Sequence, residues 1–561
     1  MFKSCISTSK LKSNFSMEPQ NSRLSIWLPL LLGLMLAAGI LLGNLLRNQQ
    51  GNGHQGKSFS TPDKIGSILS YIDENYVDSV SRQRITEEII EKILADLDPH
   101  STYIPGRNMR EVNESLRGQF DGIGVQFNMV NDTVLVIQPT RGGPSDQAGI
   151  RAGDRIIMVD TLAIAGVKMP EDSIVAMLKG PRGSTVNVGV YRRGEPETLR
   201  FEITRGVIPV SSIEVAYMVT PETGLIKITT FSQTTYREFT EALNQLKELN
   251  CSKLILDLRG NSGGIMEPAI KIADEFLEKG QMIVYTEGRA RKRQEYRATG
   301  RGMGETLKLA ILIDEGSASA SEIIAGAIQD NDRGWIIGRR SFGKGLVQEQ
   351  AMLNDGSALR LTTARYYTPS GRSIQKSYEN GSQEYYLDIA RRYRKGELLA
   401  ADSIHFDDSL KYTTAGGRTV YGGGGIMPDF FVPYDTAGIT PLFMRINRVG
   451  AIYRYSLTWA DDHRQKLNQY QDARQLSEYL DRVGVATQFR RHLTSLGFDF
   501  PDSQWDESLL IINTQLKAYI ARNILDNAGF YPIIEEIDNA LLAARDFMTK
   551  QTSGPVSPKA E

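Results

Sequence analysis

Three short segments of this chain carry residue types that together could perform nucleophilic catalysis. Residues 256–264 form an apolar run that ends in a glycine-rich turn, residues 314–322 contain three serines before a helical stretch, and residues 341–348 place Lys344 between two glycines. A serine hydroxyl needs a neighbouring base to become a good nucleophile. Lysine can be that base when burial lowers its pKa. The three segments therefore predict a reactive serine that uses a lysine as its base.

The residues alone leave parts of this assignment open. Ser317, Ser319 and Ser321 all fit the nucleophile position, because each lies near a helix start whose free N–H groups favour negative charge. A histidine could still reach the site through the fold, although all five lie outside the three segments: His54, His100, His405, His463 and His492. Each segment also has a purely structural interpretation, since a serine run is typical of a helix start and a lysine between glycines is typical of a turn.

Two stretches upstream, residues 118–125 and 141–156, resemble the PDZ domain. The first resembles the loop whose backbone N–H groups bind the terminal carboxylate of a peptide that adds as a strand to the sheet edge. The predicted carboxylate-binding residues are Gly122, Ile123, Gly124 and Val125. The second stretch resembles the turn-helix-turn of the same domain. The alternative is that these glycines only turn a small β domain that binds nothing.

The remaining pattern indicates which elements must position these residues. Apolar residues recur at helical spacing in residues 61–114, and residues 115–206 change to short strand-like runs broken by Gly and Pro. Residues 207–436 alternate strand and helix, which predicts an α/β core. Residues 437–561 are again helical in pattern. We therefore expect an α/β core preceded by a mostly-β domain and followed by a helical C-terminal extension.

The N-terminus predicts a single membrane-spanning helix at residues 24–46, an uncharged run long enough to cross a bilayer. Four basic residues precede the run, Lys3, Lys10, Lys12 and Arg23, and only Arg47 follows it closely. By the positive-inside rule, this asymmetry places residues 1–23 in the cytoplasm and the chain after the run outside it. Residues 47–60 read as a linker. The competing interpretation is a signal peptide cleaved near residues 36–39. Either way, we expect the catalytic part on the periplasmic side of the inner membrane.

Composition excludes several other classes of function. The 65 basic and 66 acidic residues give a formal net charge of -1, so a nucleic-acid partner is not expected. The two cysteines, Cys5 and Cys251, are too few and too far apart for a metal cluster. The glycine run at residues 422–425 lacks the Lys-Ser/Thr of a phosphate loop. No cofactor and no metal are expected.

Taken in order, residues 61–435 resemble the carboxyl-terminal processing proteases, the tail-specific S41-type serine peptidases of bacterial envelopes and plastids. The resemblance includes residues 97–103 and 423–429 as well as the PDZ-like and serine/lysine segments. It implies a ClpP/crotonase-like α/β core with a PDZ domain inserted before it.

The resemblance also assigns roles to single residues. It implies Ser319 as the nucleophile, Lys344 as the general base and Gln348, at a helical-turn spacing, as the residue that orients the lysine. The oxyanion-hole donors fall on the backbone N–H groups of Gly264 and Ala320.

The expected function is that of an envelope endopeptidase that recognises exposed protein C-termini and processes or degrades envelope proteins. The expected partners are protein substrates, the membrane through residues 24–46, and a second copy or an adaptor through the C-terminal helices. The alternative is an inactive PDZ scaffold, or a carrier of apolar ligands, on the same core.

Overall fold

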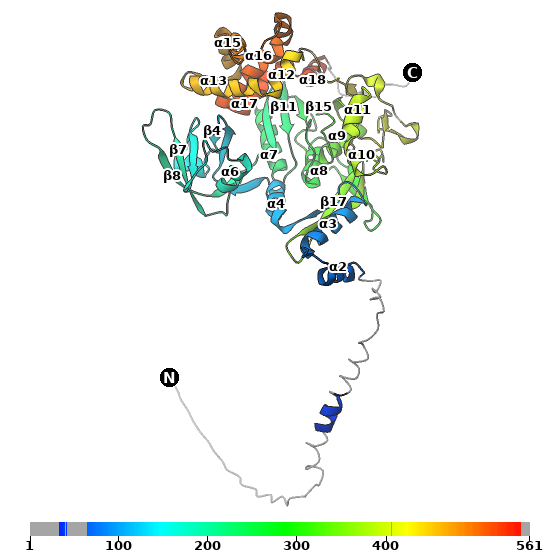
Figure 1. Ribbon diagram of the computed structural model, residues 1–561. Helices are drawn as coiled ribbons and strands as arrows, with labels where there is room; N and C mark the ends of the chain where they lie inside the picture. The colour runs from blue at the N-terminus through cyan, green and yellow to red at the C-terminus, as the bar shows by residue number, and fades with distance from the viewer. Residues whose placement is uncertain (1–32, 40, 42–63, 406, 551–561) are drawn as a thin grey trace, which may run out of the picture. The chain divides into compact units, whose positions relative to one another are not determined.

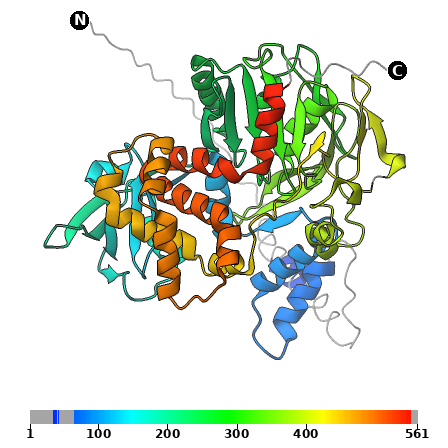
Figure 2. The same cartoon turned by 90° about the horizontal axis from the view of Figure 1, so that it is seen from above.

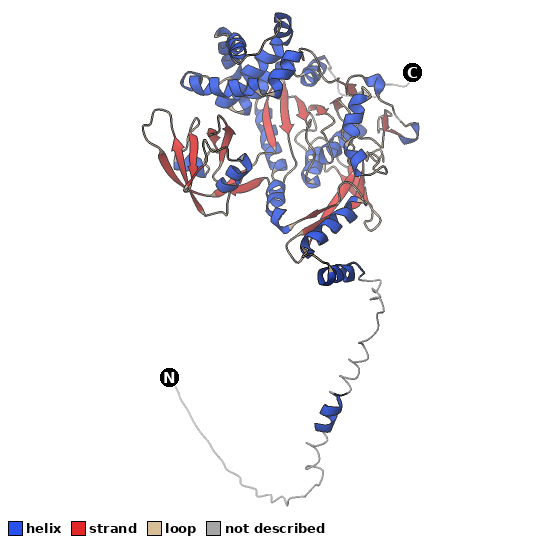
Figure 3. Cartoon of the chain, in the orientation of Figure 1, coloured by secondary structure: helices blue, strands red, loops and turns tan. Residues whose placement is uncertain are grey.

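The computed structural model describes residues 33–39, 41, 64–405 and 407–550 (Figures 1 and 3). The chain divides into two compact units, residues 1–86 and 87–561. The first unit contains α2 (Lys64–Asn75), which buries Leu69, and α3 (Arg82–Ala95) crosses the boundary.

The predicted tail, membrane helix and linker lie wholly or largely outside the described residues. Among the residues that are described, no helix combines the length and the apolar character that a bilayer crossing requires.

A six-stranded sheet forms the frame of the second unit. Its strand order is β10-β11-β12-β15-β16-β21, and every neighbouring pair is parallel except the antiparallel β10 and β11. The strands are β10 (Ile213–Met218), β11 (Thr223–Ile228), β12 (Lys253–Asp257), β15 (Lys308–Ile313), β16 (Trp335–Gly338) and β21 (Phe430–Phe431). The central strands are continuous apolar runs because the sheet is covered on both faces.

Three crossover helices cover one face of this sheet: α7 (Thr235–Glu248), α8 (Met266–Asp274) and α9 (Ala320–Asp330). Leu254 and Leu256 of β12 point toward that side, and Ile255 between them points to the other. There Leu541 and Ala544 of α18 (Asn539–Lys550) pack on it. Figure 2 shows α18, in red, lying across the green strands. The end of the helical C-terminal region is therefore part of the α/β core.

A second, antiparallel sheet lies beside the frame and carries the lysine segment. Its central strand is β18 (Ala358–Tyr367), which pairs with β1, β13 and β17. The other strands are β1 (Thr102–Ile104), β13 (Met282–Glu287), β14 (Gln294–Arg297) and β17 (Leu346–Met352). Strand β1 lies in residues 61–114, where only helix was expected; its three residues are too few to produce a visible period.

The predicted PDZ domain is a sheet of order β3-β4-β5-β7-β8, in which β3 is an edge strand, packed around its own apolar cluster. Its elements are β2 (Gln119–Gly122), β3 (Val125–Met129), β4 (Val134–Pro139), α5 (Pro144–Ala148), β5 (Arg155–Val159), β6 (Leu162–Ala163), α6 (Glu171–Leu178), β7 (Thr185–Tyr191), β8 (Leu199–Thr204) and β9 (Gly206–Pro209). Strands β2 and β9 pair with each other where the domain joins the rest of the chain.

Helices α12 to α17 build a separate apolar cluster near the C-terminal end of the chain, in yellow to orange-red in Figure 1. They are α12 (Pro441–Arg448), α13 (Ala451–Leu467), α14 (Ala473–Arg482), α15 (Val485–Ser495), α16 (Asp502–Leu525) and α17 (Asn527–Ile534). Leu457 of α13 packs against Leu135 and Ile137 on the outer face of β4. The remaining elements are α4 (Met109–Arg117), α10 (Ser382–Tyr386), α11 (Asp388–Arg394), β19 (Lys411–Thr413) and β20 (Thr419–Tyr421).

Candidate active site

The three segments singled out in the sequence meet at one cavity of about 360 Å³. Gly264 comes from the turn after β12, Ser319 from the start of α9, Lys344 from the segment that leads into β17, and Gln348 from β17 itself. Apolar side chains form much of the remaining wall: Leu116, Ile265, Met266, Ile323, Leu346 and Val347.

Of the three candidate serines, only Ser319 lines this cavity. Ser317 and Ser321 are fully buried, and their hydroxyls donate to the carbonyls of Leu258 (2.8 Å) and Asn261 (2.9 Å). The hydroxyl oxygen of Ser319 accepts the backbone N–H of Glu322 in a capping box, but its proton is donated to no described residue. The structure therefore separates the three serines, which the residue pattern could not do.

The backbone of Ser319 has φ 54° and ψ −112°, a region that a residue with a side chain rarely adopts. Such a conformation persists only when its surroundings hold it in place. Strain of this kind is common where a side chain must be presented to a reactant.

The buried carboxylate of Glu322 supplies much of that hold. One oxygen, Oε2, accepts the backbone N–H groups of Ser319 (2.8 Å) and Lys344 (2.9 Å). The other, Oε1, accepts the N–H of Gly343 (2.8 Å) and the hydroxyl of Ser341 (2.5 Å). Burial raises the pKa of Glu322 to about 7, although these four donors act against the rise. One side chain thus joins the serine segment to the lysine segment.

Tyr366 on β18 makes a second connection between the same two segments. Its buried hydroxyl donates to the carbonyl of Lys344 and lies 3.1 Å from the carbonyl oxygen of Ser319. The backbones on both sides of the cavity are therefore fixed relative to each other from two directions.

Lys344 is half-buried, and its ammonium group has no hydrogen-bond partner among the described residues. Burial lowers the pKa of Lys344, and the positive charge of Arg360 lowers it further, while Glu322 and Asp98 act in the opposite direction. The net direction is the one that a lysine base requires, because it increases the neutral fraction of the amine.

Gln348 lines the same cavity, but the helical spacing expected between it and Lys344 is wrong. Gln348 lies in strand β17, and a β-bulge falls between Val347 and Gln348. Four residues are one turn of a helix and also an even number of strand residues, so spacing alone could not separate the two. Its Nε2 donates to Oγ1 of Thr362 on β18 at 3.3 Å.

The turn after β12 needs glycine at two positions. At Gly264, with φ 144°, a Cβ would lie 2.2 Å from the carbonyl oxygen of Phe231, and at Gly263 it would lie 2.7 Å from Cβ of Ser319. Asn261 holds the turn by donating to the carbonyl of Ile228 and accepting the N–H of Gly263. The N–H groups of Gly264 and Ala320 have no hydrogen-bond acceptor within the described part of the chain.

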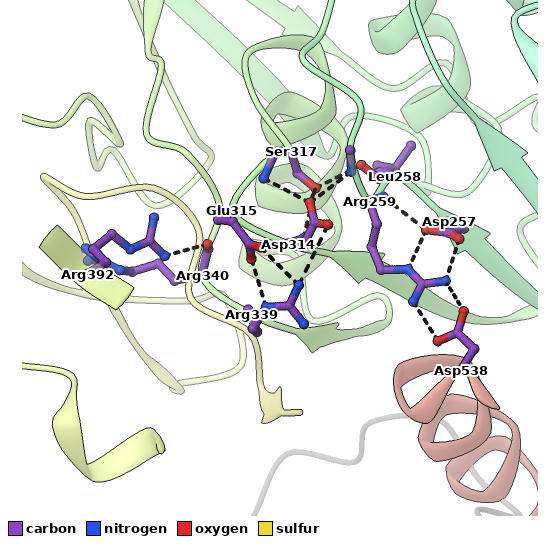
Figure 4. Close-up of polar contacts among 12 residues, drawn as sticks. Asp257, Leu258, Arg259, Asp314, Glu315, Ser317, Arg339, Arg340, Arg392 and Asp538 are labelled. Atoms are coloured by element: carbon purple, nitrogen blue, oxygen red, sulfur yellow. Dashed lines mark hydrogen bonds and ion pairs between the residues drawn. The ribbon is translucent and has the colours of Figure 1, made fainter. Parts of the chain in front are cut away.

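One support of this turn, Asp538, has no motif around it that could have predicted its role (Figure 4). Arg259, which leads into the turn, donates to both carboxylate oxygens of Asp257 and of Asp538, with each ion pair at 2.7 Å. Burial alone would raise the pKa of Asp257, but Arg259 and Lys227 outweigh it and hold that pKa below its usual range. Asp538 directly precedes α18, the helix that packs on the sheet face opposite α7, α8 and α9. The C-terminal region therefore stabilises the turn through the ion pair of Asp538 with Arg259.

No histidine lines the cavity among the described residues. His100 is close enough for the charge of Lys344 to affect its ionisation. Burial lowers the pKa of His100 to about 4, and the charge of Lys344 contributes to that shift. Its Nε2 pairs with the hydroxyl of Tyr385 at 2.8 Å. His54 lies outside the described residues, and His463 and His492 lie in α13 and α15.

The predicted carboxylate-binding loop of the PDZ domain connects β2 to the edge strand β3. The carbonyls of Ile123 and Gly124 accept the N–H groups of Ser145 and Thr140. The N–H groups of Ile123 and Gly124 themselves have no acceptor among the described residues. Gly124 has φ 74°, and a Cβ there would lie 2.7 Å from Cδ1 of Ile208. Gly122 and Val125 flank these residues at the ends of β2 and β3.

Comparison with known families identifies three regions of the chain. Residues 222–381 match peptidase family S41, residues 122–203 match the PDZ domain, and residues 442–526 match a family of unknown function.

Individual relatives agree with these matches. A carboxy-terminal-processing protease of Bartonella bacilliformis is 37% identical over 56% of this chain and 72% of its own length. The carboxy-terminal processing protease CtpA of Bacillus subtilis is 31% identical over 60% of this chain and 73% of its own length. A solved photosystem II D1 C-terminal processing protease is 29% identical, covers 57% of this chain and 86% of its own, and has a TM-score of 0.33. With the serine and lysine segments at one cavity and a PDZ domain upstream, the chain belongs to peptidase family S41, as a carboxy-terminal processing serine protease.

Proposed function

We propose that this protease cleaves peptide bonds with a serine/lysine dyad formed by Ser319 and Lys344. The observation that carries the proposal is the contrast among the three serines. Ser317 and Ser321 donate their hydroxyl protons to buried carbonyls, whereas Ser319 donates to no described residue and lines the cavity that also holds the half-buried Lys344. Gln348 orients the lysine.

In the acylation step, the neutral amine of Lys344 takes the proton of the Ser319 hydroxyl as its oxygen attacks the substrate carbonyl carbon. The N–H groups of Gly264 and Ala320 are free to donate to the oxyanion that forms. The resulting ammonium then gives its proton to the leaving amine as the C–N bond breaks, which leaves an ester on Ser319. Water attacks this ester, passes a proton to Lys344 and releases the new C-terminus, and the proton returns to Ser319.

We further propose that the PDZ domain binds the C-terminus of the substrate. The edge of β3 is unpaired among the described strands, so a peptide can add to it by backbone hydrogen bonds. The free N–H groups of Ile123 and Gly124 lie just before this strand, where they can bind a terminal carboxylate together with the backbone of Gly122 and Val125.

The proposed location is the periplasmic side of the inner membrane, with residues 24–46 as a single-pass anchor and envelope proteins as substrates. The uncharged run at 24–46 and the basic residues before it support this placement. Alkaline phosphatase becomes active only after export from the cytoplasm. Fused after residue 60, it should therefore be active, and an inactive fusion that stays in the cytoplasm would contradict the placement.

The dyad makes a sharp prediction for Lys344→Arg. Arginine keeps the positive charge but does not deprotonate in proteins, so Lys344→Arg should be as inactive as Lys344→Ala and Ser319→Ala in cleavage of an unfolded protein. If Lys344→Arg kept more than about a tenth of the wild-type rate, a barrier change under ~1.4 kcal/mol, lysine would not be the base.

The same dyad fixes the direction of the pH dependence. Because Lys344 must be neutral, kcat should rise with pH through the lowered pKa of this residue. Arg360→Gln removes a charge that lowers this pKa, so the rise should move to higher pH in that variant. A rise at unchanged or lower pH would argue against Lys344 as the titrating group.

The PDZ proposal is tested on the full chain carrying Ser319→Ala, which binds without cleaving. Amidation of a peptide's terminal carboxylate should weaken its binding about ten- to a hundredfold, because it removes charge-assisted hydrogen bonds. Gly124→Glu should mimic amidation, since its side chain meets Ile208 and adds a like charge.

Gly194→Glu is the matched control for this experiment. It adds the same charge at another left-handed glycine, φ 95°, with no atom near the new Cβ. Equal affinities for the acid and the amide in fluorescence titrations would leave the domain without a carboxylate-binding role.

A further inference from the structure

The side-chain amide of Gln348 belongs to a hydrogen-bond chain that starts outside the cavity. The chain runs from the Asp98 carboxylate to the Thr362 hydroxyl at 3.1 Å, and from there to Nε2 of Gln348 at 3.3 Å. Asp98 lies in the turn between α3 and β1. This turn belongs to residues 97–103, a segment that takes no part in the dyad mechanism described above. Strand β18 connects the two regions because it pairs with β1 on one side and β17 on the other.

Asp98 is a buried acceptor with several donors around it. Only 7% of the residue is exposed, and its Oδ1 accepts the backbone N–H groups of His100 and Ser101, each at 2.8 Å. Its Oδ2 accepts the hydroxyl of Ser101 at 2.6 Å, and that hydroxyl oxygen accepts the N–H of Thr362 at 3.1 Å. Thr362 is thus held through both its backbone and its side chain.

This arrangement leaves one orientation for the amide of Gln348. The Thr362 hydroxyl has a single hydrogen, and a carboxylate can only accept, so the hydrogen points to Asp98. The hydroxyl then presents a lone pair to Gln348, which favours the NH₂ end of the amide over its oxygen. Oε1 of Gln348 is therefore directed away from Thr362.

We propose that Asp98 and Thr362 are positioning residues that fix the amide of Gln348 so that Oε1 accepts an N–H of Lys344. The proposal rests on the dyad described above. With Oε1 toward the lysine, the amine lone pair remains available to the proton of Ser319. In the reversed amide, the NH₂ group would donate to that lone pair and block the base.

The test uses two substitutions of Thr362 in the full chain. Thr362→Val keeps the shape but removes the hydroxyl, and we expect it to lower kcat about three- to tenfold, the effect of one neutral hydrogen bond, with KM unchanged. Thr362→Ser restores the hydroxyl and should return kcat to within about twofold of wild type. A purely structural role for Thr362 would not produce this split between kcat and KM together with rescue by serine.

A double-mutant cycle shows whether the effect passes through Gln348. We expect Gln348→Ala to lower kcat, and Thr362→Val to add no further loss in the Gln348→Ala background. Asp98→Asn should lower kcat and should likewise be non-additive with Thr362→Val. Asp355→Asn is the matched control, because Asp355 accepts the N–H and hydroxyl of Ser357 in an exposed turn without contacting Gln348.

The outcomes separate this inference from the dyad itself. The positioning role would be overturned if Thr362→Val kept the wild-type kcat, or if Thr362→Val lowered kcat equally in the wild-type and Gln348→Ala backgrounds. The dyad would still stand in that case as long as Ser319→Ala and Lys344→Ala are inactive. Activity in Lys344→Ala would overturn both the dyad and the inference.

Discussion

The active site depends on one buried carboxylate that binds two distant parts of the backbone. Glu322 lies on the first turn of α9, so it can accept the N–H of Ser319 three residues before it and those of Gly343 and Lys344 from the other segment. Its burial carries an electrostatic cost, which appears as a pKa raised to about 7. The four hydrogen bonds offset part of that cost. They also hold Ser319 in a backbone conformation that would otherwise relax.

The parallel sheet provides the frame on which these segments meet. The turn after β12 and the start of α9 both follow the carboxyl ends of neighbouring parallel strands, so they emerge at the same edge of the sheet. The C-terminal region supports this frame from the other side, through α18 and the ion pair of Asp538 with Arg259. It also contacts the PDZ domain, where Asp461 pairs with Arg155 at 2.6 Å. The C-terminal helices therefore touch both the protease core and the PDZ domain.

Much of the site could be predicted from the sequence because its residues lie in short, ordered motifs. The apolar runs of β12 and β15 and the glycines after β12 identify an α/β core and its turn. The residue pattern left the choice among Ser317, Ser319 and Ser321 open, and only the family resemblance implied Ser319. The fold supplies the physical reason, because it decides which hydroxyls find a carbonyl inside the core. The roles of Asp538 and Thr362 could not be predicted from the sequence. Asp538 is connected to the site by an ion pair and Thr362 by strand pairing, in each case with residues that need not be near in the chain. The helical spacing expected between Lys344 and Gln348 is wrong, because a separation of four residues fits a strand as well as a helix and Gln348 lies in β17.

Amide hydrogen exchange in wild type and in Glu322→Gln is the most direct test of the claim that Glu322 holds the serine and lysine segments together. The amide of glutamine cannot accept at both ends, so one pair of donors loses its acceptor. We predict faster exchange at the N–H groups whose acceptor is lost, either those of Ser319 and Lys344 or that of Gly343, with the amides of β12 and β15 unchanged. Unchanged exchange at all three, or faster exchange throughout the core, would contradict the claim.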